Sequence, residues 1–266
     1  MELNLTHKHV LITGGSKGIG LACAKVFLEE GCKVSLVSRN PATLESAKQQ
    51  LSTQVPGSQD RIALFSADLQ NAASAEVALN AAEKTFGAVD VLVNSAGAAK
   101  RTPAESLSPV FFREAMDAKF FTYINMIDPV VKRMGARGTG VIVNVIGSGG
   151  KVPSTAHIAG GSANAALMLT TAGLAAAYGS KGVRINAVNP AGTLTDRLVE
   201  GLKVNADHEK ISQEEVLKRM TAKVPMGRLA SPEEVADTVV YLASNRASYV
   251  TGAIITMDGA AHPCVV

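Results

Sequence analysis

Short segments rich in β-branched residues alternate along the whole chain with longer stretches that have the period of a helix. The segments predicted as strands are 9–13, 33–38, 61–65, 89–94, 140–145, 183–188 and 253–257. Helices are expected at about 18–30, 41–51, 72–86, 108–134 and 159–178, with a last one starting at Ser231. Strands separated by helices usually pair in parallel and are covered on both faces. We therefore predict a single α/β domain over residues 1–266, a doubly wound sheet of seven parallel strands in the order 3-2-1-4-5-6-7.

The composition agrees with a buried sheet and argues against several classes of protein. Hydrophobic residues make up 47% and charged residues 18% of the chain, while aromatic residues make up only 4%, so alanine, valine, leucine and isoleucine must form the core. The net charge of +3 comes from scattered basic residues, which does not indicate nucleic-acid binding. The three cysteines lack metal-binding spacing. We find no signal peptide and no apolar run near ~18 residues, and expect a cytoplasmic protein that binds neither membrane nor metal.

A glycine-rich turn follows the first predicted strand and leads into a helix. It reads Thr13-Gly14-Gly15-Ser16-Lys17-Gly18-Ile19-Gly20. Glycines allow positive φ angles and a close approach of the backbone to a pyrophosphate, and the N-terminus of the helix offers N–H groups with a partial positive charge. Ordinary tight turns also contain glycine. The position between a strand and a helix nevertheless favours a dinucleotide site made by Gly14, Ser16, Lys17, Gly18, Ile19 and Gly20.

The residues after the second strand distinguish between the two nicotinamide dinucleotides. An acidic residue there would bind the free 2′-hydroxyl of NAD and repel a 2′-phosphate. This chain instead has Ser38 and Arg39, and Lys17 projects from the glycine turn. A hydroxyl and two cations suit a phosphate dianion through charge-assisted hydrogen bonds, so we predict NADP as the cofactor. The alternative is that both cations are merely solvated.

Further motifs, in the right order, resemble those of the short-chain dehydrogenase/reductase family. The turn matches its TGxxxGxG motif, residues 94–97 (Asn-Ser-Ala-Gly) its NNAG motif, residues 190–195 its PG segment, and residues 258–260 its terminal DGG pattern. The resemblance implies a Rossmann-type fold, an oxidoreductase acting on a small-molecule substrate, and a homo-oligomer, either a dimer or a homotetramer. It also implies cofactor contacts from Asp68, Leu69, Asn94, Ala96, Gly97, Pro190, Gly192, Thr193 and Thr195.

The three positions at which the family usually has serine, tyrosine and lysine hold Gly147, Gly160 and Asn164. The predicted strand 140–145 fixes the first position, and residues 164–167 in the following helix fix the last. In the family the tyrosine is the general acid and base, and the lysine lowers its pKa. Glycine can do neither, and the two glycines would leave volume for a bulkier substrate.

Candidates for the missing chemistry lie close by in the sequence. The family position that usually holds asparagine aligns with Lys119, so lysine and asparagine have exchanged places. We expect Lys119 to supply the ammonium group, with Asn164 as its hydrogen-bonding partner. Ser148 lies in a flexible glycine loop, and His157 precedes the helix with an ordinary pKa near ~6.5 that suits proton transfer. The alternatives are a surface lysine and a solvated histidine.

A charged, helix-prone insertion at about 196–228 separates the sixth strand from the last helix and predicts a substrate lid. A cofactor site with a lid favours an NADP(H)-dependent oxidoreductase that acts on a carbonyl or an alcohol, with a rearranged catalytic site. Two alternatives stay open. One is a catalytically silent NADP-binding protein with a regulatory or scaffold role, and the other is a non-redox lyase or isomerase on the same fold.

Overall fold

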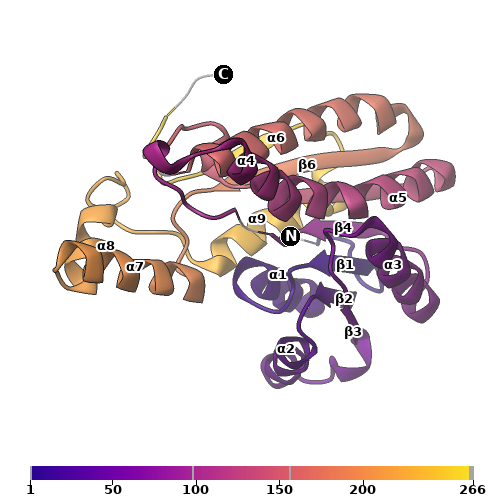
Figure 1. Ribbon diagram of the computed structural model, residues 1–266. Coiled ribbons are helices and arrows are strands. Elements are labelled where there is room, and N and C mark those ends of the chain that lie inside the picture. Colours follow the sequence, from indigo (N-terminus) through magenta and orange to yellow (C-terminus); the bar gives the residue numbers. More distant parts are fainter. Residues whose placement is uncertain (1, 98, 156, 264–266) are drawn as a thin grey trace.

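The computed structural model describes residues 2–97, 99–155 and 157–263 (Figure 1). Within these residues, parallel strands form one seven-stranded sheet in the order β3-β2-β1-β4-β5-β6-β7, which confirms the predicted fold and strand order. The strands are β1 (His9–Thr13), β2 (Lys33–Ser38), β3 (Ile62–Ser66), β4 (Val91–Asn94), β5 (Gly140–Val145), β6 (Val183–Pro190) and β7 (Ile254–Met257).

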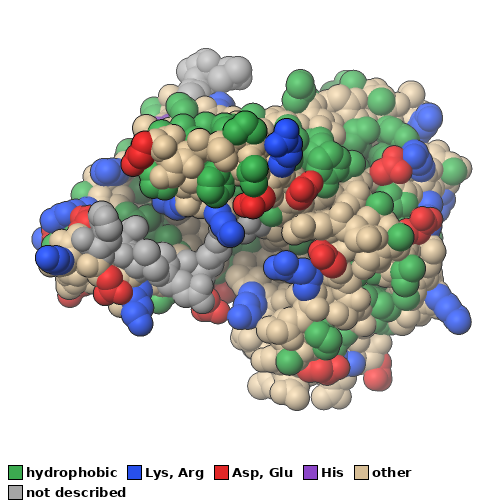
Figure 2. All heavy atoms as spheres, viewed as in Figure 1, with side chains coloured by type: hydrophobic (Ala, Val, Ile, Leu, Met, Phe, Trp, Pro, Cys, Tyr) green, Lys and Arg blue, Asp and Glu red, His purple; other side chains and the backbone are tan. Residues whose placement is uncertain are grey.

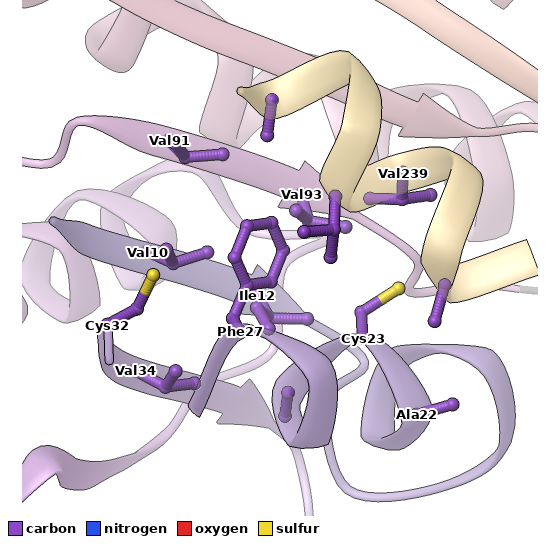
Figure 3. Close-up of a cluster of buried hydrophobic side chains, with 14 of the residues drawn as sticks. Val10, Ile12, Ala22, Cys23, Phe27, Cys32, Val34, Val91, Val93 and Val239 are labelled. Atoms are coloured by element: carbon purple, nitrogen blue, oxygen red, sulfur yellow. The ribbon is translucent and has the colours of Figure 1, made fainter. Parts of the chain in front are cut away.

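Helices cover both faces of this sheet, and each face has its own hydrophobic core. Side chains of a strand alternate between the faces, so Val10 and Ile12 of β1 pack on one side and Leu11 on the other. Figure 3 shows the first core, where Phe27 and Val239 meet the strand residues. The helices on that face are α1 (Gly18–Glu29), α2 (Pro41–Gln54) and α9 (Pro232–Ala243). Those on the other face are α3 (Ala72–Phe86), α5 (Thr122–Arg137) and α6 (Ile158–Tyr178).

The long helix predicted at 108–134 is interrupted by a wider π turn. It consists of α4 (Pro109–Ala115), the π-helical η3 (Met116–Phe121) and then α5. The Thr122 hydroxyl lies 3.0 Å from the carbonyl oxygen of Asp117 and 3.3 Å from that of Ala118, so it donates to carbonyls that the wider turn leaves available. A Cβ added to Gly97 would lie only 2.2 Å from the Ala118 oxygen. The turn therefore lies directly against the loop after β4, and π turns of this kind often occur at functional sites.

The predicted insertion forms two helices that pack on each other, α7 (Asp196–Glu209) and α8 (Gln213–Thr221). Leu202, Ala206 and Val216 form a small separate core between them. In Figure 1 this pair projects to one side of the sheet, beyond the ends of the strands. The remaining short elements are η1 (Gln59–Arg61), η2 (Ala104–Ser106), η4 (Ser148–Gly150), η5 (Gly179–Lys181) and η6 (Asn245–Ala247).

One helix in the described part of the chain is long and apolar enough, by length and composition, to cross a membrane. It spans Ile158–Lys181 with a mean hydropathy of 1.2, so the expectation that no apolar run approaches that length was wrong here. Leu167 and Ala175 of this helix are buried in the same core as Ile142 and Ile185 of the sheet. Packing against the sheet accounts for part of its apolar composition, since 44% of this apolar stretch is buried.

Candidate functional site

A cavity of about 580 Å³ lies at the carboxyl ends of strands β1 to β4. In Figure 2 the middle of the visible face is hollowed, and both basic and acidic side chains surround the hollow. Crevices at this edge of a parallel sheet are its usual ligand sites. Most of the residues predicted to hold the cofactor line the cavity, namely Gly14, Lys17, Gly18, Ile19, Ser38, Arg39, Asp68, Leu69, Ala96, Gly97 and Thr195.

The glycine turn brings the N-terminus of α1 to this cavity. Gly14 and Gly18 have φ angles of 67° and 53°, which other residues rarely adopt. A Cβ on Gly20 would lie 2.3 Å from the Gly14 carbonyl oxygen, so only glycine lets the first turn of the helix pack on the loop. Because Gly18 and Ile19 line the cavity, the partial positive charge of the helix N-terminus is directed into it.

Two cations and a hydroxyl border the cavity at the end of β2. Lys17 and Arg39 are both exposed, and Ser38, the last residue of β2, lines the cavity. The Ser16 hydroxyl donates to the Ser38 hydroxyl over 3.1 Å, so Ser16 supports this corner although it does not line the cavity itself. Asp68, an acidic residue that also lines the cavity, accepts a hydrogen bond from the Gln70 amide over 3.1 Å. This corner can hold a 2′-phosphate.

Asn94 has a buried side chain that lies beneath the cavity and does not line it. Its Nδ2 donates to the Asn144 side-chain oxygen over 3.0 Å, and its own oxygen accepts from Thr13 over 3.3 Å. Asn144 in turn donates to Thr171 of α6 over 3.0 Å. The chain of bonds links β1, β4, β5 and α6, so this residue fixes the sheet edge, whereas the sequence predicted that it contacts the cofactor.

The segment after β6 lies partly away from the nucleotide cavity. Of the predicted residues Pro190, Gly192, Thr193 and Thr195, Thr195 alone is among those lining that cavity in the described part of the chain. Thr193 is buried and pairs with Ala230 in an isolated bridge. Gly192 lines a second cavity of about 280 Å³ with side chains of the lid region and β7, chiefly Val224, Met226, Leu229 and Met257.

On the reaction side, Lys119 is a buried cation in contact with a tyrosine. Only 8% of Lys119 is exposed, and its Nζ donates to the Tyr123 hydroxyl over 2.8 Å and to the Val145 carbonyl oxygen over 3.2 Å. The same ammonium lies 4.4 Å from the centre of the Tyr123 ring. Partners of the ammonium thus include Tyr123 and Val145, whereas the sequence predicted Asn164.

Tyr123 is a residue that the sequence interpretation missed. It is fully buried, and its hydroxyl also donates to the Val145 carbonyl oxygen. Burial raises the pKa of this phenol, so it stays protonated and acts as a fixed partner for the ammonium. The spacing of four residues from Lys119 was the available signal, because such residues are neighbours on a helix.

The space expected beside Gly160 contains the imidazole ring of His157. A Cβ added to Gly160 would lie 2.1 Å from Cε1 and 2.5 Å from Nε2 of that ring. A Cβ on Gly149 would lie 3.1 Å from Cδ2 on the other side. The expectation of extra volume for a bulkier substrate is therefore wrong at residue 160, because a side chain of the protein already fills it.

Asn164 and Ser148 lie beside the same loop. Only 6% of Asn164 is exposed, and its Nδ2 lies 3.4 Å from the place of a Cβ on Gly147. Ser148 begins η4, and its carbonyl oxygen accepts from the amides of Lys151 and Val152. The four predicted reaction residues thus lie around the carboxyl end of β5. No group of three histidine, cysteine or acidic residues that could hold a metal ion occurs among the described residues.

Known proteins resemble this chain over nearly its whole length. A family model described as enoyl-(acyl carrier protein) reductase matches residues 14–262. The chain is 33% identical over 270 residues to a 3α-hydroxysteroid dehydrogenase of Mediterraneibacter gnavus, and the alignment covers 98% of this chain and 100% of the relative.

Solved structures agree with this result. The L-sorbose reductase of Gluconobacter frateurii, complexed with NADPH and L-sorbose, has a TM-score of 0.92 and 26% identity, with each chain covered in full. An NADPH-bound short chain oxidoreductase of Pseudomonas aeruginosa PAO1, described as containing an atypical catalytic center, has a TM-score of 0.88 and 26% identity, with 97% of this chain and 98% of that chain covered.

Proposed function

Because the chain belongs to the short-chain dehydrogenase/reductase family, we propose that it is an NADP(H)-dependent oxidoreductase that interconverts a carbonyl and an alcohol group of a small molecule. The observation that carries this proposal is the cavity at the carboxyl edge of the sheet, in which the α1 N-terminus, Lys17, Ser38 and Arg39 converge. The N–H groups at the α1 N-terminus suit a pyrophosphate, and the side chains of Lys17, Ser38 and Arg39 suit a 2′-phosphate.

The residues of this cavity fit the cofactor part by part. Gly14 and Gly18 keep the backbone close enough for amide groups to reach a pyrophosphate, and Arg39 and Lys17 provide charge for the 2′-phosphate. When bound, the nicotinamide supplies or accepts a hydride. The chain itself must then orient the substrate and provide a proton at the substrate oxygen.

We further propose that the catalytic site is rearranged, with Gly147, Gly160 and Asn164 in place of serine, tyrosine and lysine. Support comes from the buried ammonium of Lys119, which is fixed by Tyr123 at the end of β5. Loss of a general acid typically costs about 10²–10⁴ in rate, so a site with a fixed cation and a substitute donor would retain measurable turnover.

A second candidate is a catalytically silent NADP-binding protein. The observation that favours it is at Gly160, the position of the family's tyrosine, where the His157 ring fills the space and no phenol is present. The two functions predict the same nucleotide binding and differ in turnover.

Titration by nicotinamide fluorescence tests the nucleotide first, with tighter binding of NADPH than NADH expected. Consumption of bound NADPH in the presence of a panel of small ketones and aldehydes, and formation of NADPH from NADP⁺ with the matching alcohols, then tests the reaction. Tight binding without turnover of any member would favour the silent protein, and equal binding of NADH would contradict the assignment of the 2′-phosphate site.

We also propose that the protein is a cytoplasmic dimer or tetramer and that α7 and α8 cover the bound substrate. Apolar side chains exposed on the α4–α6 side support the assembly, with Leu169 exposed to 77% and Val110 to 54%. Sedimentation analysis tests the assembly, with a monomer as the contradicting result.

A further inference from the structure

The imidazole of His157 occupies a place built for it by glycines. Its ring lies between Gly149 of the loop after β5 and Gly160 in the first turn of α6. At Gly160 even a methyl group would overlap the ring, since the nearest ring atom lies 2.1 Å from the Cβ position. At Gly149 a methyl group would press on the ring at 3.1 Å.

Glycine in a helix is unfavourable compared with alanine, and the first turn of α6 contains two glycines in a row, Gly160 and Gly161. Gly161 is required because a Cβ there would lie 2.6 Å from the Gly149 carbonyl oxygen. Gly173 of the same helix has nothing within 4 Å of its Cβ position. The glycines are therefore tightly packed only at the start of α6, where the loop of Gly149 and the His157 ring lie against the helix.

This place lies at the same edge of the sheet as the nucleotide cavity. Asn94 and Asn144 are partners at the ends of β4 and β5, so the loops that follow these strands are neighbours. Gly97 in the first loop lines the cavity, and Gly149 in the second contacts the imidazole. Asn164 Nδ2 lies 3.6 Å from the Cβ position of Gly149, so the ring and the amide flank the same glycine.

We propose that His157 is the proton donor and acceptor of the reaction and that Gly149 and Gly160 serve to seat its ring. This inference rests on the proposed oxidoreductase function. In the reducing direction the carbonyl carbon receives a hydride from the dihydronicotinamide, and the carbonyl oxygen takes the proton of the imidazolium N–H. The C=O group becomes CH–OH, the imidazole becomes neutral, and a proton taken up from the solvent restores the imidazolium; the oxidation of an alcohol reverses each step.

The first test uses three substitutions and compares turnover with NADPH binding. In His157→Gln the proton-transferring ring is lost, so turnover is expected to fall at least ~100-fold while the Kd for NADPH stays within about threefold. Gly160→Ala displaces the ring without removing it, and a fall of about tenfold is expected. Gly173→Ala is the matched control, because it makes the same change in the same helix with open space around it. Its turnover should remain unchanged.

The second test does not depend on turnover. The chain has five histidines, and the ring signals of His157 in isotope-labelled protein are assigned by their absence from the His157→Gln pattern. Adding NADP⁺ should shift the His157 ring signals. His9 serves as the internal reference, because its ring is held by Gly87 and Ser35 at the opposite end of β1.

These measurements separate the two proposals. The role of His157 would be overturned if the turnover of the unsubstituted protein persisted in His157→Gln, or if the His157 ring signals did not shift when NADP⁺ binds. The oxidoreductase function would stand in either case. Absence of turnover in the unsubstituted protein, with NADP⁺ bound, would overturn the oxidoreductase function and the proton transfer with it. If His157→Gln does not fold, the comparison of Gly160→Ala with Gly173→Ala still tests the proposal. Equal turnover in those two variants would contradict the idea that Gly160 holds the His157 ring in place.

Discussion

Glycines border both the nucleotide cavity and the predicted reaction site, but they border an open cavity in the first and a side chain of the protein in the second. On the nucleotide side, Gly14 and Gly18 take positive φ angles beside a cavity of about 580 Å³, and cations border the space that they leave. On the reaction side, Gly149 and Gly160 leave space as well, but the imidazole of the same chain fills it. A glycine in a sequence therefore indicates a close approach without saying whether a ligand or the protein itself approaches.

The largest expected effect concerns the nucleotide side, where charge faces a ligand. Arg39→Glu places a carboxylate next to the predicted 2′-phosphate, so the Kd for NADPH should rise about 100-fold or more, since charge-assisted hydrogen bonds are replaced by repulsion. The Kd for NADH should change little. Fluorescence titration of both nucleotides measures this. Lys84→Glu makes the same change of net charge on an exposed part of α3 and should alter neither Kd.

The fold and the nucleotide side were predictable because their signals are local. Strand periodicity gave β1 and β5 their observed boundaries, and the glycine turn from Gly14 to Gly20 predicted a ligand-binding loop at the place where the structure has a cavity. The reaction side depends on contacts between distant segments. Nothing near His157 in the sequence predicts that its ring packs on Gly149, or that the π turn at Lys119 lies against the loop of Gly97.

The second prediction concerns the buried cation of the reaction side. Lys119→Met keeps an unbranched side chain, one atom shorter, and removes the charge, so turnover should fall about 10- to 100-fold if the ammonium stabilises the developing charge on the substrate oxygen. Removing a buried charge also removes its desolvation cost, so the free energy of unfolding should change by no more than about 1 kcal/mol. Steady-state kinetics and urea unfolding measure the two effects. Unchanged turnover would show that the cation serves packing alone.

A smaller effect is expected when the partner of that cation is changed. Tyr123→Phe keeps the ring beneath the ammonium but removes the hydroxyl that bonds to Lys119 and Val145. Loss of such a buried hydrogen bond should lower the free energy of unfolding by about 1 kcal/mol, with kcat reduced more than KM changes. Tyr178→Phe is the matched control, because Tyr178 also lies beneath a lysine ammonium, that of Lys181 at 4.9 Å, far along α6. A loss of equal size in both variants would contradict a specific role for the Tyr123 hydroxyl.

The smallest effect compares His157 with His9, which lies at the end of β1 opposite to the nucleotide cavity. His9 is buried in β1, where Nδ1 lies 2.7 Å from the Gly87 carbonyl oxygen and Nε2 lies 2.8 Å from the Ser35 hydroxyl. Nδ1–H therefore donates to the carbonyl, and Nε2 accepts from the serine. Burial lowers the pKa of His9 below its ordinary value of 6.5, although the bond to Gly87 opposes the shift. The ring is neutral and structural, whereas we assign proton transfer to His157.

A pH series can sharpen this contrast, because a lowered pKa in the folded state means that the unfolded chain binds more protons. The contribution of His9 to stability is complete above pH 6.5 and is lost as the pH falls toward its folded pKa, by at most about 1.4 kcal/mol per pH unit. Urea unfolding at pH 7.5 and pH 5.5 should therefore show a smaller decline for His9→Gln than for the unsubstituted protein. His7→Asn is the control, since His7 is exposed with a φ of 65° that asparagine tolerates. If His7→Asn flattened the decline as much as His9→Gln, the buried ring would not be its source, and the division between a structural and a reactive histidine would lose this support.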